Sequence, residues 1–360
     1  MLSFADVGRL AIETRTRDGS RRITAAIDGE SLFNGLQIGS TVSALIADLS
    51  DSDRPAHQAP IFCAVRFRDG WHVYSRVHQQ VDRWCFIRTS VVAIPASGDD
   101  LIWLDTAVEL HARHASILNS HVCTKPATFV GKEVETKFTL PARTSIWRLA
   151  LLIHQGLTAN KIPNMVPRFG SDFESYDFDN FLFEVTDPEE DRGYVSFMTV
   201  QPDLYRLKRK RFSVDARIRA EEVGGEFRPD RPLGAYVRGI LSLEARRLPS
   251  FRRVRHDVML ESIVTGGHYC ILFDRCSLHA APQEVLVQCE IEYLRTRSVL
   301  PHDENQILEE FELLTAWVQG FLNEQGLAVD ANYYSKLSYL RDVVQRRPEL
   351  ADETDHAFTT

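Results

Sequence analysis

The chain has 360 residues, enough for two domains of roughly 150 residues each, and its 44% hydrophobic and 26% charged residues are typical of a globular protein. No apolar run approaches the ~20 residues of a membrane-spanning helix, and residues 1–20 are too charged for a secretory signal. The net charge of −8 argues against a general nucleic-acid or membrane-surface binder. The six cysteines form no C-x-x-C pair and lie mostly in apolar stretches, as reduced core cysteines do, so we expect a cytoplasmic protein without membrane contact.

Residues 1–125 are predicted to form a smaller β-rich region. Asp69-Gly70 stands between two strand-like segments and indicates a hairpin. The candidate strands cover residues 22–27, 61–67, 71–77, 84–89 and 101–104. His111 and His114 have a spacing that can support metal binding, but we interpret them as ordinary surface or cap histidines. We therefore expect no catalytic group from this region.

The pattern changes near Lys125-Pro126, where the main domain is expected to begin. Residues 129–140 alternate with period two, and Thr144-Ser145 then begins an apolar helix that ends at Gly156. Trp147 in this helix is interpreted as a core residue. Further strands are predicted over residues 181–185, 194–200, 204–212, 216–220, 253–260, 268–273 and 284–294.

The end of the chain is predicted to be helical. Apolar residues recur at helical spacing over residues 307–322, and a second helix covers about 333–345. Residues 346–360 are polar and are expected to form a flexible tail. The main domain is therefore placed at residues 126–345.

Several predicted strands carry charged side chains at every second residue, so that the charges of one strand share one face. An isolated face of this kind usually means only that one side of a sheet faces solvent. Here the charged faces recur along the chain. They are Glu133, Glu135 and Lys137; Arg206, Lys208 and Lys210; Arg217 and Arg219; Arg253 and Arg255; and Glu290 and Glu292.

Together these faces suit a metal-dependent site for an extended polyphosphate. Glutamates in E-x-E pairs offer the oxygen ligands that Mg²⁺ or Mn²⁺ prefers, and lysine or arginine neutralises phosphate oxygens. Side chains at i and i+2 project about 6.6 Å apart, which suits a row of ligands along a chain of phosphates. If the strands close into a barrel, all these faces can point into one lumen. The 15 basic and 6 acidic residues between Arg206 and Arg255 also indicate an anionic ligand.

In their order along the chain, these motifs resemble the CYTH, or triphosphate tunnel metalloenzyme, superfamily. Residues 133–137 match its E-x-E-x-K signature, residues 205–212 take the place of its basic strand, and residues 290–292 resemble its final E-x-E strand. Asp274 looks like the aspartate that precedes that strand, and Ser335-Lys336 opens a segment like the closing S-K-x-x-x-L helix. The resemblance covers roughly residues 126–345.

The resemblance implies an α+β chain, in which an antiparallel β-barrel, the triphosphate tunnel, has flanking helices and follows the smaller β-rich N-terminal region. The implied substrate-binding residues are Lys137, Arg206, Lys208, Lys210, Arg253 and Arg255. The implied ligands of Mg²⁺ or Mn²⁺ are Glu133, Glu135, Glu290 and Glu292. The implied catalytic residues are Glu133, Glu135, Lys137 and Asp274, with Asp274 as a further metal or water-orienting carboxylate.

Two features depart from the family pattern. The connection from Leu140 to the basic strand is long and carries an acidic, aromatic insert over residues 172–179. The basic strand also has lysine where arginine is commoner. These departures concern the substrate more than the fold.

The implied function is metal-dependent hydrolysis of a triphosphate or short polyphosphate, inorganic or organic, with a small triphosphate-containing molecule as the partner. Three alternatives stay open: a class IV-type adenylyl cyclase, an RNA 5′-triphosphatase, and a non-catalytic polyphosphate- or nucleotide-binding module. The net charge of −8 gives no support to a nucleic-acid partner beyond a 5′-triphosphate RNA end. The two Glu-x-Glu pairs favour catalysis, because a pure anion binder gains nothing from carboxylates beside phosphate.

Overall fold

The computed structural model describes residues 127–352, apart from 160, 169–171, 263–264 and 297–302, and, before residue 127, six strands with a few single positions. The six strands form one sheet in the order β1-β3-β4-β5-β6-β2. Their bounds are β1 Ile12–Glu13, β2 Glu30–Phe33, β3 Ala44–Leu45, β4 Phe62–Arg66, β5 Trp71–Gln80 and β6 Arg83–Val92.

Part of the N-terminal prediction is tested by these strands. β4, β5 and β6 confirm the strands predicted over 61–67, 71–77 and 84–89. β4 and β5 pair antiparallel across Asp69-Gly70, as the hairpin prediction requires. The strands predicted over 22–27 and 101–104, and the histidines His111 and His114, lie outside the described residues.

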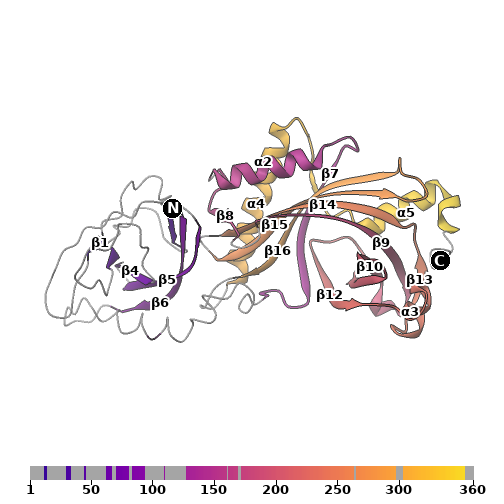
Figure 1. Cartoon of the computed structure of the whole chain (residues 1–360), viewed down its shortest axis with the longest axis horizontal. Helices are drawn as coiled ribbons and strands as arrows, with labels where there is room; N and C mark the ends of the chain where they lie inside the picture. Colours follow the sequence, from indigo (N-terminus) through magenta and orange to yellow (C-terminus); the bar gives the residue numbers. More distant parts are fainter. Residues whose placement is uncertain are drawn as a thin grey trace.

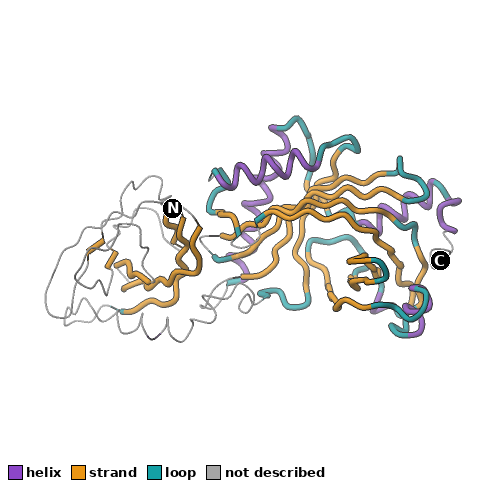
Figure 2. Tube along the Cα trace, in the orientation of Figure 1, coloured by secondary structure: helices purple, strands orange, loops and turns teal. Residues whose placement is uncertain are grey.

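Eight antiparallel strands close into a barrel, which runs through the right-hand part of Figure 1 and is coloured orange in Figure 2. The order around the wall is β9-β10-β11-β12-β7-β16-β15-β14, and β14 pairs with β9 to close the ring. The strands are β7 Lys132–Leu140, β9 Phe173–Asp187, β10 Gly193–Gln201, β11 Leu204–Arg211, β12 Ile218–Phe227, β14 Phe251–Ser262, β15 Gly267–Leu278 and β16 Val285–Thr296. Short strands extend the wall: β8 Met165–Pro167, β13 Glu244–Arg247 and β17 Ala331–Asn332. The predicted fold class, an α+β chain with an antiparallel barrel and flanking helices, is confirmed.

The acidic, aromatic insert forms part of the barrel wall rather than a loop in a long connection. Residues 173–180 are the first half of β9 and pair with β14 from Phe251 to Val258. The predicted strand over 181–185 was therefore too short. Both faces of this half-strand mix aromatic and polar residues, which hides the period of two.

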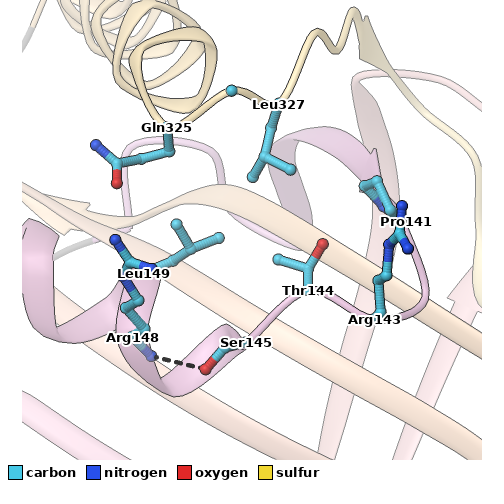
Figure 3. A pocket seen from close by; sticks show the side chains of 9 residues that line it. Pro141, Arg143, Thr144, Ser145, Arg148, Leu149, Gln325 and Leu327 are labelled. Carbon is cyan, nitrogen blue, oxygen red and sulfur yellow. Dashed lines mark hydrogen bonds between the residues drawn. The ribbon is translucent and has the colours of Figure 1, made fainter.

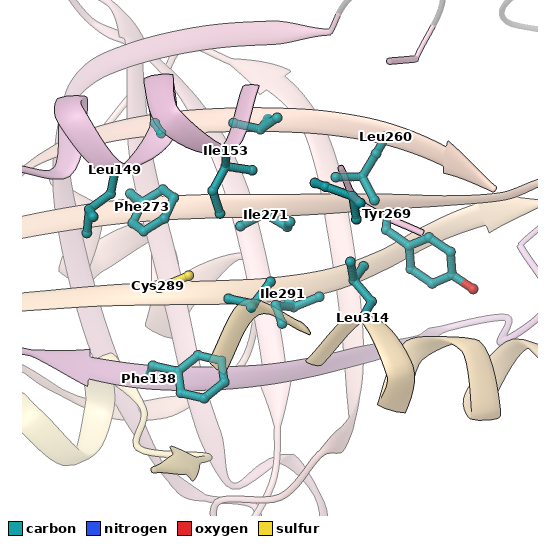
Figure 4. Close-up of a cluster of buried hydrophobic side chains, with 14 of the residues drawn as sticks. Phe138, Leu149, Ile153, Leu260, Tyr269, Ile271, Phe273, Cys289, Ile291 and Leu314 are labelled. Carbon is teal, nitrogen blue, oxygen red and sulfur yellow. The ribbon is translucent and has the colours of Figure 1, made fainter. Parts of the chain in front are cut away.

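The main hydrophobic core lies outside the barrel, between the wall and helices α2 (Ile146–Thr158) and α4 (Glu304–Glu324). Figure 4 shows Phe273 and Ile271 of the wall beside Leu149 and Ile153 of α2, and Ile291 on the side of Leu314 of α4. Burial of each such side chain contributes about 1.5–3 kcal/mol relative to exposure. Alternation then directs the intervening residues of the same strands into the lumen.

Helix α2 begins where the sequence predicts. The hydroxyl of Ser145 accepts a hydrogen bond from the Arg148 backbone N–H at 3.4 Å, which caps the helix (Figure 3). The interpretation of Trp147 as core is wrong, because its side chain is 51% exposed. The buried face of α2 carries positions such as 149, 150 and 153, and residue 147 points away from it.

A second helix of the C-terminal region closes one end of the lumen. Helix α5 (Lys336–Arg346) packs Leu337, Leu340 and Val343 against wall residues that include Leu182 and Phe251. Leu350, in the turn η2 (Pro348–Asp352), is buried in the same cluster, so the segment predicted to be a flexible tail begins with a packed turn. Residues 353–360 lie outside the described part. Among the helices of the described residues, none combines the length and apolar character that crossing a membrane requires.

The described cysteines agree with the interpretation of reduced core residues. Cys270, Cys276 and Cys289 are buried and free. Burial raises the pKa of each of these thiols, which makes them poor nucleophiles.

Candidate active site in the barrel lumen

The charged faces of the strands meet inside the barrel. The lumen residues are mostly buried and none exposes more than 20% of its side chain. The acidic ones are Glu133, Glu135, Glu221, Asp257, Asp274, Glu290 and Glu292. The basic ones are Lys137, Lys208, Lys210, Arg219, Arg253, Arg255 and Lys336. These sets are equal in size, so the lumen is neutral when every group is ionised; the cavity among them has a volume of about 460 Å³ including its open part.

Three glutamates point at one another and form what we call the converging group: Glu133, Glu135 and Glu292. One carboxylate oxygen from each lies within 4.8 Å of the others. Register explains the approach, since Glu135 of β7 is the direct partner of Glu292 of β16. Glu135 is fully buried, and its carboxylate makes ion-pair contacts with Arg219 and, at 3.2 Å, with the Lys137 ammonium rather than regular hydrogen bonds. Three carboxylates whose oxygens converge in this way fit a hard divalent cation such as Mg²⁺ or Mn²⁺.

Basic side chains surround the converging group. Lys210 and Arg219 contact Glu133 and Glu135, respectively. The Lys208 ammonium lies 3.4 Å from Glu133 and 2.8 Å from Glu221. Burial opposes ionisation of Glu133, but Lys210 and Lys208 hold its pKa well below the usual value. The carboxylate is therefore ready to bind a cation at neutral pH.

Asp274 and Glu290 form a second set, which we call the paired group, because each is held by basic side chains. The Lys336 ammonium lies 2.6 Å from Glu290 and 3.0 Å from Asp274. The Arg253 Nε donates to Asp274 at 2.7 Å, and the Lys137 ammonium donates to Glu290 at 3.1 Å. Lys137 also lies 3.2 Å from Glu135, and so stands between the two groups.

The paired group is ionised in spite of its burial. Burial alone would raise the pKa of Asp274, but Arg253 and Lys336 lower it to about 2. Lys137 and Lys336 likewise hold the pKa of Glu290 well below the usual value against the effect of burial. Glu290 thus lies outside the converging group, and its carboxylate forms ion pairs with two lysines.

The barrel brings together all the sequence-predicted site residues except one. Arg206 lies at the rim, where its side chain is 49% exposed and pairs with Glu226 at 2.5 Å. The pairing of β11 with β10 is regular from Arg206 to Lys210, so Arg206 keeps the parity of the two lysines, and its exposure follows from its position near the start of the strand.

The prediction that Arg217 and Arg219 share a face is wrong. Arg217 precedes β12 and lies on the outer side, where its guanidinium stacks 4.9 Å over Phe311 and pairs with Glu312 of α4. Arg219 faces the lumen. Strand alternation applies only within the strand, which begins at Ile218.

Four lumen residues were not predicted as site residues: Arg219, Glu221, Asp257 and Lys336. Glu221 continues the alternation from Arg219, and Asp257 continues it from Arg253 and Arg255, so the period of two carried a signal for both. Lys336 comes from α5, and a strand pattern holds no signal for it. Burial raises the pKa of Asp257 to about 6, although Arg255 opposes the shift.

Another cavity, larger at about 800 Å³ including its open part, lies outside the barrel between the start of α2 and the end of α4 (Figure 3). Its charged lining residues are Arg143 and Arg148, both exposed, and no carboxylate lines it. It therefore lacks the ligands for a divalent cation, and the lumen is the better candidate site.

The chain matches no family model and no curated protein. Among solved structures it is similar to the S. pombe Pct1 RNA triphosphatase in complex with the Spt5 CTD, at 12% identity and a TM-score of 0.24, over 56% of this chain and 81% of that one. The S. pombe Pct1 RNA triphosphatase without that partner gives 12% identity and a TM-score of 0.23, over 57% of this chain and 84% of that one. Similarity at this level carries no conclusion about the reaction, for which the lumen itself is the basis.

Proposed function

We propose that this chain hydrolyses a triphosphate or short polyphosphate inside the barrel lumen, with Mg²⁺ or Mn²⁺ bound. One observation carries the proposal: three glutamates, with one oxygen of each within 4.8 Å of the others, lie in a buried lumen lined by lysines and arginines. A cation binder has no need of so many bases, and an anion binder has no need of the glutamates. A substrate that is itself a complex of phosphate and metal needs both.

In this proposal a row of basic residues binds the successive phosphate groups of the substrate. The row consists of the sequence-predicted residues Lys137, Lys208, Lys210, Arg253 and Arg255, joined by Arg219 and Lys336. Arg206 is assigned to the rim, where it would meet the outer part of a substrate. The lumen bases are already compensated by lumen acids, so phosphate has to take over contacts that carboxylates hold in the free protein.

The metal is assigned to Glu133, Glu135 and Glu292. When bound, Mg²⁺ or Mn²⁺ would neutralise phosphate charge and polarise the bond to be broken. Binding at Glu133 would compete with Lys210 and Lys208, and the released lysines would be free to bind phosphate. Glu290, although first proposed as a ligand, is assigned instead to the orientation of Lys137 and Lys336.

Hydrolysis then needs an attacking water and a stabilised leaving group. Water attacks the terminal phosphorus, the phosphoanhydride P–O bond breaks, and the departing phosphate carries the negative charge toward lysine and arginine. Asp274 can accept a hydrogen bond from that water and orient it. With a pKa of about 2 it is a weak base, so the proton ends on product phosphate rather than on Asp274.

The proposed partner is a small triphosphate-containing molecule of the cytoplasm, and a 5′-triphosphate RNA end uses the same phosphate chemistry. We further propose that residues 1–125 form a separate unit without a catalytic group, and that residues 126–345 are the catalytic domain. The charged residues of the lumen all come from the second unit.

The test is incubation of the full chain with tripolyphosphate, ATP or thiamine triphosphate, each with Mg²⁺ or Mn²⁺, followed by identification of the products. We expect release of orthophosphate, and its loss in Glu135→Gln, which keeps the side-chain shape and removes the charge. Formation of a cyclic nucleotide and diphosphate from ATP would identify the chain as a cyclase instead of a hydrolase. Binding of all three compounds without turnover would identify it as a binding module.

A further inference from the structure

An aspartate outside the lumen holds the helix that closes it. Asp215 lies in the connection between β11 and β12, at the N-terminus of α5, 120 residues away in sequence. Its Oδ2 accepts hydrogen bonds from the Ser335 backbone N–H at 3.1 Å and from the Ser338 hydroxyl at 2.7 Å. Its Oδ1 lies 3.6 Å from the Arg219 guanidinium. One carboxylate thus touches both α5 and a lumen arginine.

These contacts fix the first turn of α5. The Ser335 hydroxyl caps the helix by accepting from the Ser338 backbone N–H at 3.0 Å, and Asp215 holds both serines from outside the helix. A negative charge at a helix N-terminus is also favourable by its interaction with the helix dipole. Residues 335 and 336 are adjacent, so the position of Ser335 sets where the Lys336 side chain enters the lumen.

Lys336 depends on this support more than a surface lysine would. It is 8% exposed, and burial together with Arg253 lowers its pKa, while Asp274 and Glu290 favour the charged form. Its ammonium reaches Glu290 and Asp274 at 2.6 and 3.0 Å. A shift of the first turn of α5 by an ångström would lengthen both contacts beyond a hydrogen bond.

We propose that Asp215 is a positioning residue: by fixing the first turn of α5 it places Lys336 in the lumen to bind substrate phosphate. The role of Lys336 toward phosphate rests on the proposed function. Asp215 itself touches no substrate, and acts through Ser335 and Ser338 on the first turn of α5.

The experiment compares Asp215→Ala and Asp215→Asn in the full chain, with Asp191→Ala as the matched control. Asp191 also pairs with two arginines, Arg209 and Arg211, but on the outer face of the barrel. Hydrogen exchange over residues 335–346 reports the helix directly, without any turnover. Asp215→Ala should exchange faster there, whereas Asp215→Asn, which keeps an oxygen acceptor, and Asp191→Ala should not.

Kinetics with tripolyphosphate then separate positioning from stability alone. Asp215→Ala should raise KM about five- to tenfold and change kcat less than about twofold, as expected for a lost cap that acts on substrate binding. The asparagine variant should recover most of the parent KM. In a Lys336→Met background, Asp215→Ala should add little, because the lysine through which it acts is gone.

Two results would overturn the proposal. One is faster exchange in α5 with an unchanged KM, which would make Asp215 a helix cap and nothing more. The other is an equal rise in KM with and without Lys336. If the parent chain neither binds nor cleaves tripolyphosphate, the proposed function has failed first, and the exchange data still show whether Asp215 holds α5.

Discussion

The converging group and the paired group lie in the same lumen, are similarly buried and come from strands that are neighbours in the barrel, but they differ in what surrounds them. In the paired group, Asp274 and Glu290 are held by three bases that lie within hydrogen-bond reach. In the converging group, basic side chains also contact Glu133 and Glu135, but one oxygen of each of three glutamates lies within 4.8 Å of the others.

A buried charge has to be compensated, and the two groups solve this in different ways. The paired group is satisfied by the chain itself, so it is suited to hold lysines in position. We propose that the converging group binds a cation from solution. On this proposal Glu290 and Glu292, two residues apart in one motif, have different roles.

The largest expected effect comes from splitting that motif. Glu292→Gln should weaken Mn²⁺ binding and slow tripolyphosphate hydrolysis by on the order of 100-fold each, because a charged ligand is lost. Glu290→Gln, the matched control on the same strand, should keep most of the affinity for Mn²⁺. Electron paramagnetic resonance of Mn²⁺ with the protein alone measures the binding. Equal losses in both variants would erase the distinction between the groups.

The next effect concerns the bases that face the converging group. Lys210→Met should weaken tripolyphosphate binding by about 1.5–3 kcal/mol, the usual value of a hydrogen bond to a charged group, and added Mn²⁺ should not restore it. Calorimetric titration gives the affinity. Arg209→Met on the outer face of β11 is the control and should stay within ~0.5 kcal/mol of the parent. If this face of the strand were only a solvent-exposed surface without function, both variants would bind tripolyphosphate within ~0.5 kcal/mol of the parent.

A smaller effect concerns stability and pH in the paired group. The pKa of Asp274 falls from its usual 3.8 to about 2 in the folded chain, so its contribution is present above pH 4 and is lost as the pH falls from about 4 to 2. Asp274→Asn should lower the free energy of unfolding at pH 7 by at least ~2 kcal/mol. It should also reduce the further decrease in this free energy between pH 4 and 2. Urea denaturation at several pH values measures both.

Asp257 provides the control of opposite sign. Its pKa is raised from 3.8 to about 6, so its contribution is present below pH 4 and is lost as the pH rises from about 4 to 6. The free energy of unfolding of the parent should therefore fall as the pH rises from about 4 to 6, and Asp257→Asn should lack this decrease. If Asp274→Asn were as stable as the parent at pH 7, the ion pairs of the paired group would contribute nothing.

The smallest expected effect is that of removing the N-terminal region. A fragment starting at Ala127 keeps Thr128, whose hydroxyl accepts a hydrogen bond from the Tyr293 hydroxyl at 2.8 Å, and keeps every lumen residue. Its hydrolysis of tripolyphosphate should stay near that of the full chain. A folded fragment without activity, with circular dichroism as the measure of folding, would contradict the separation at residues 125–126.

The parts of the site that could be predicted are those that depend on a local pattern. The strands β7, β11, β14 and β16 show their charged faces in the sequence, because alternation in an extended chain is a local property. The site residues could be named for the same reason. The prediction that β9 starts at 181 fell short where Tyr176 and Phe178 share a stretch with four acids, so neither face is apolar.

The parts that could not be predicted depend on contacts between distant segments. Glu290 and Glu292 have the same parity, and only the register with β7 and the arrival of Lys336 from α5 separate their roles. The part played by Asp215 likewise depends on a helix that begins 121 residues later in the sequence. Such pairings are set by the folded chain as a whole, and no short window contains them.

Helix α5 also gives the lumen a direction. Its leucines fill the end next to the paired group, and packed side chains leave no path for a phosphate chain. Under the proposed function, a substrate therefore enters with its terminal phosphate leading toward Lys336 and its other end trailing. On the same proposal, a long polyphosphate would not be threaded through and cut in the middle. It would be shortened from its end, and each product would leave by the way the substrate came.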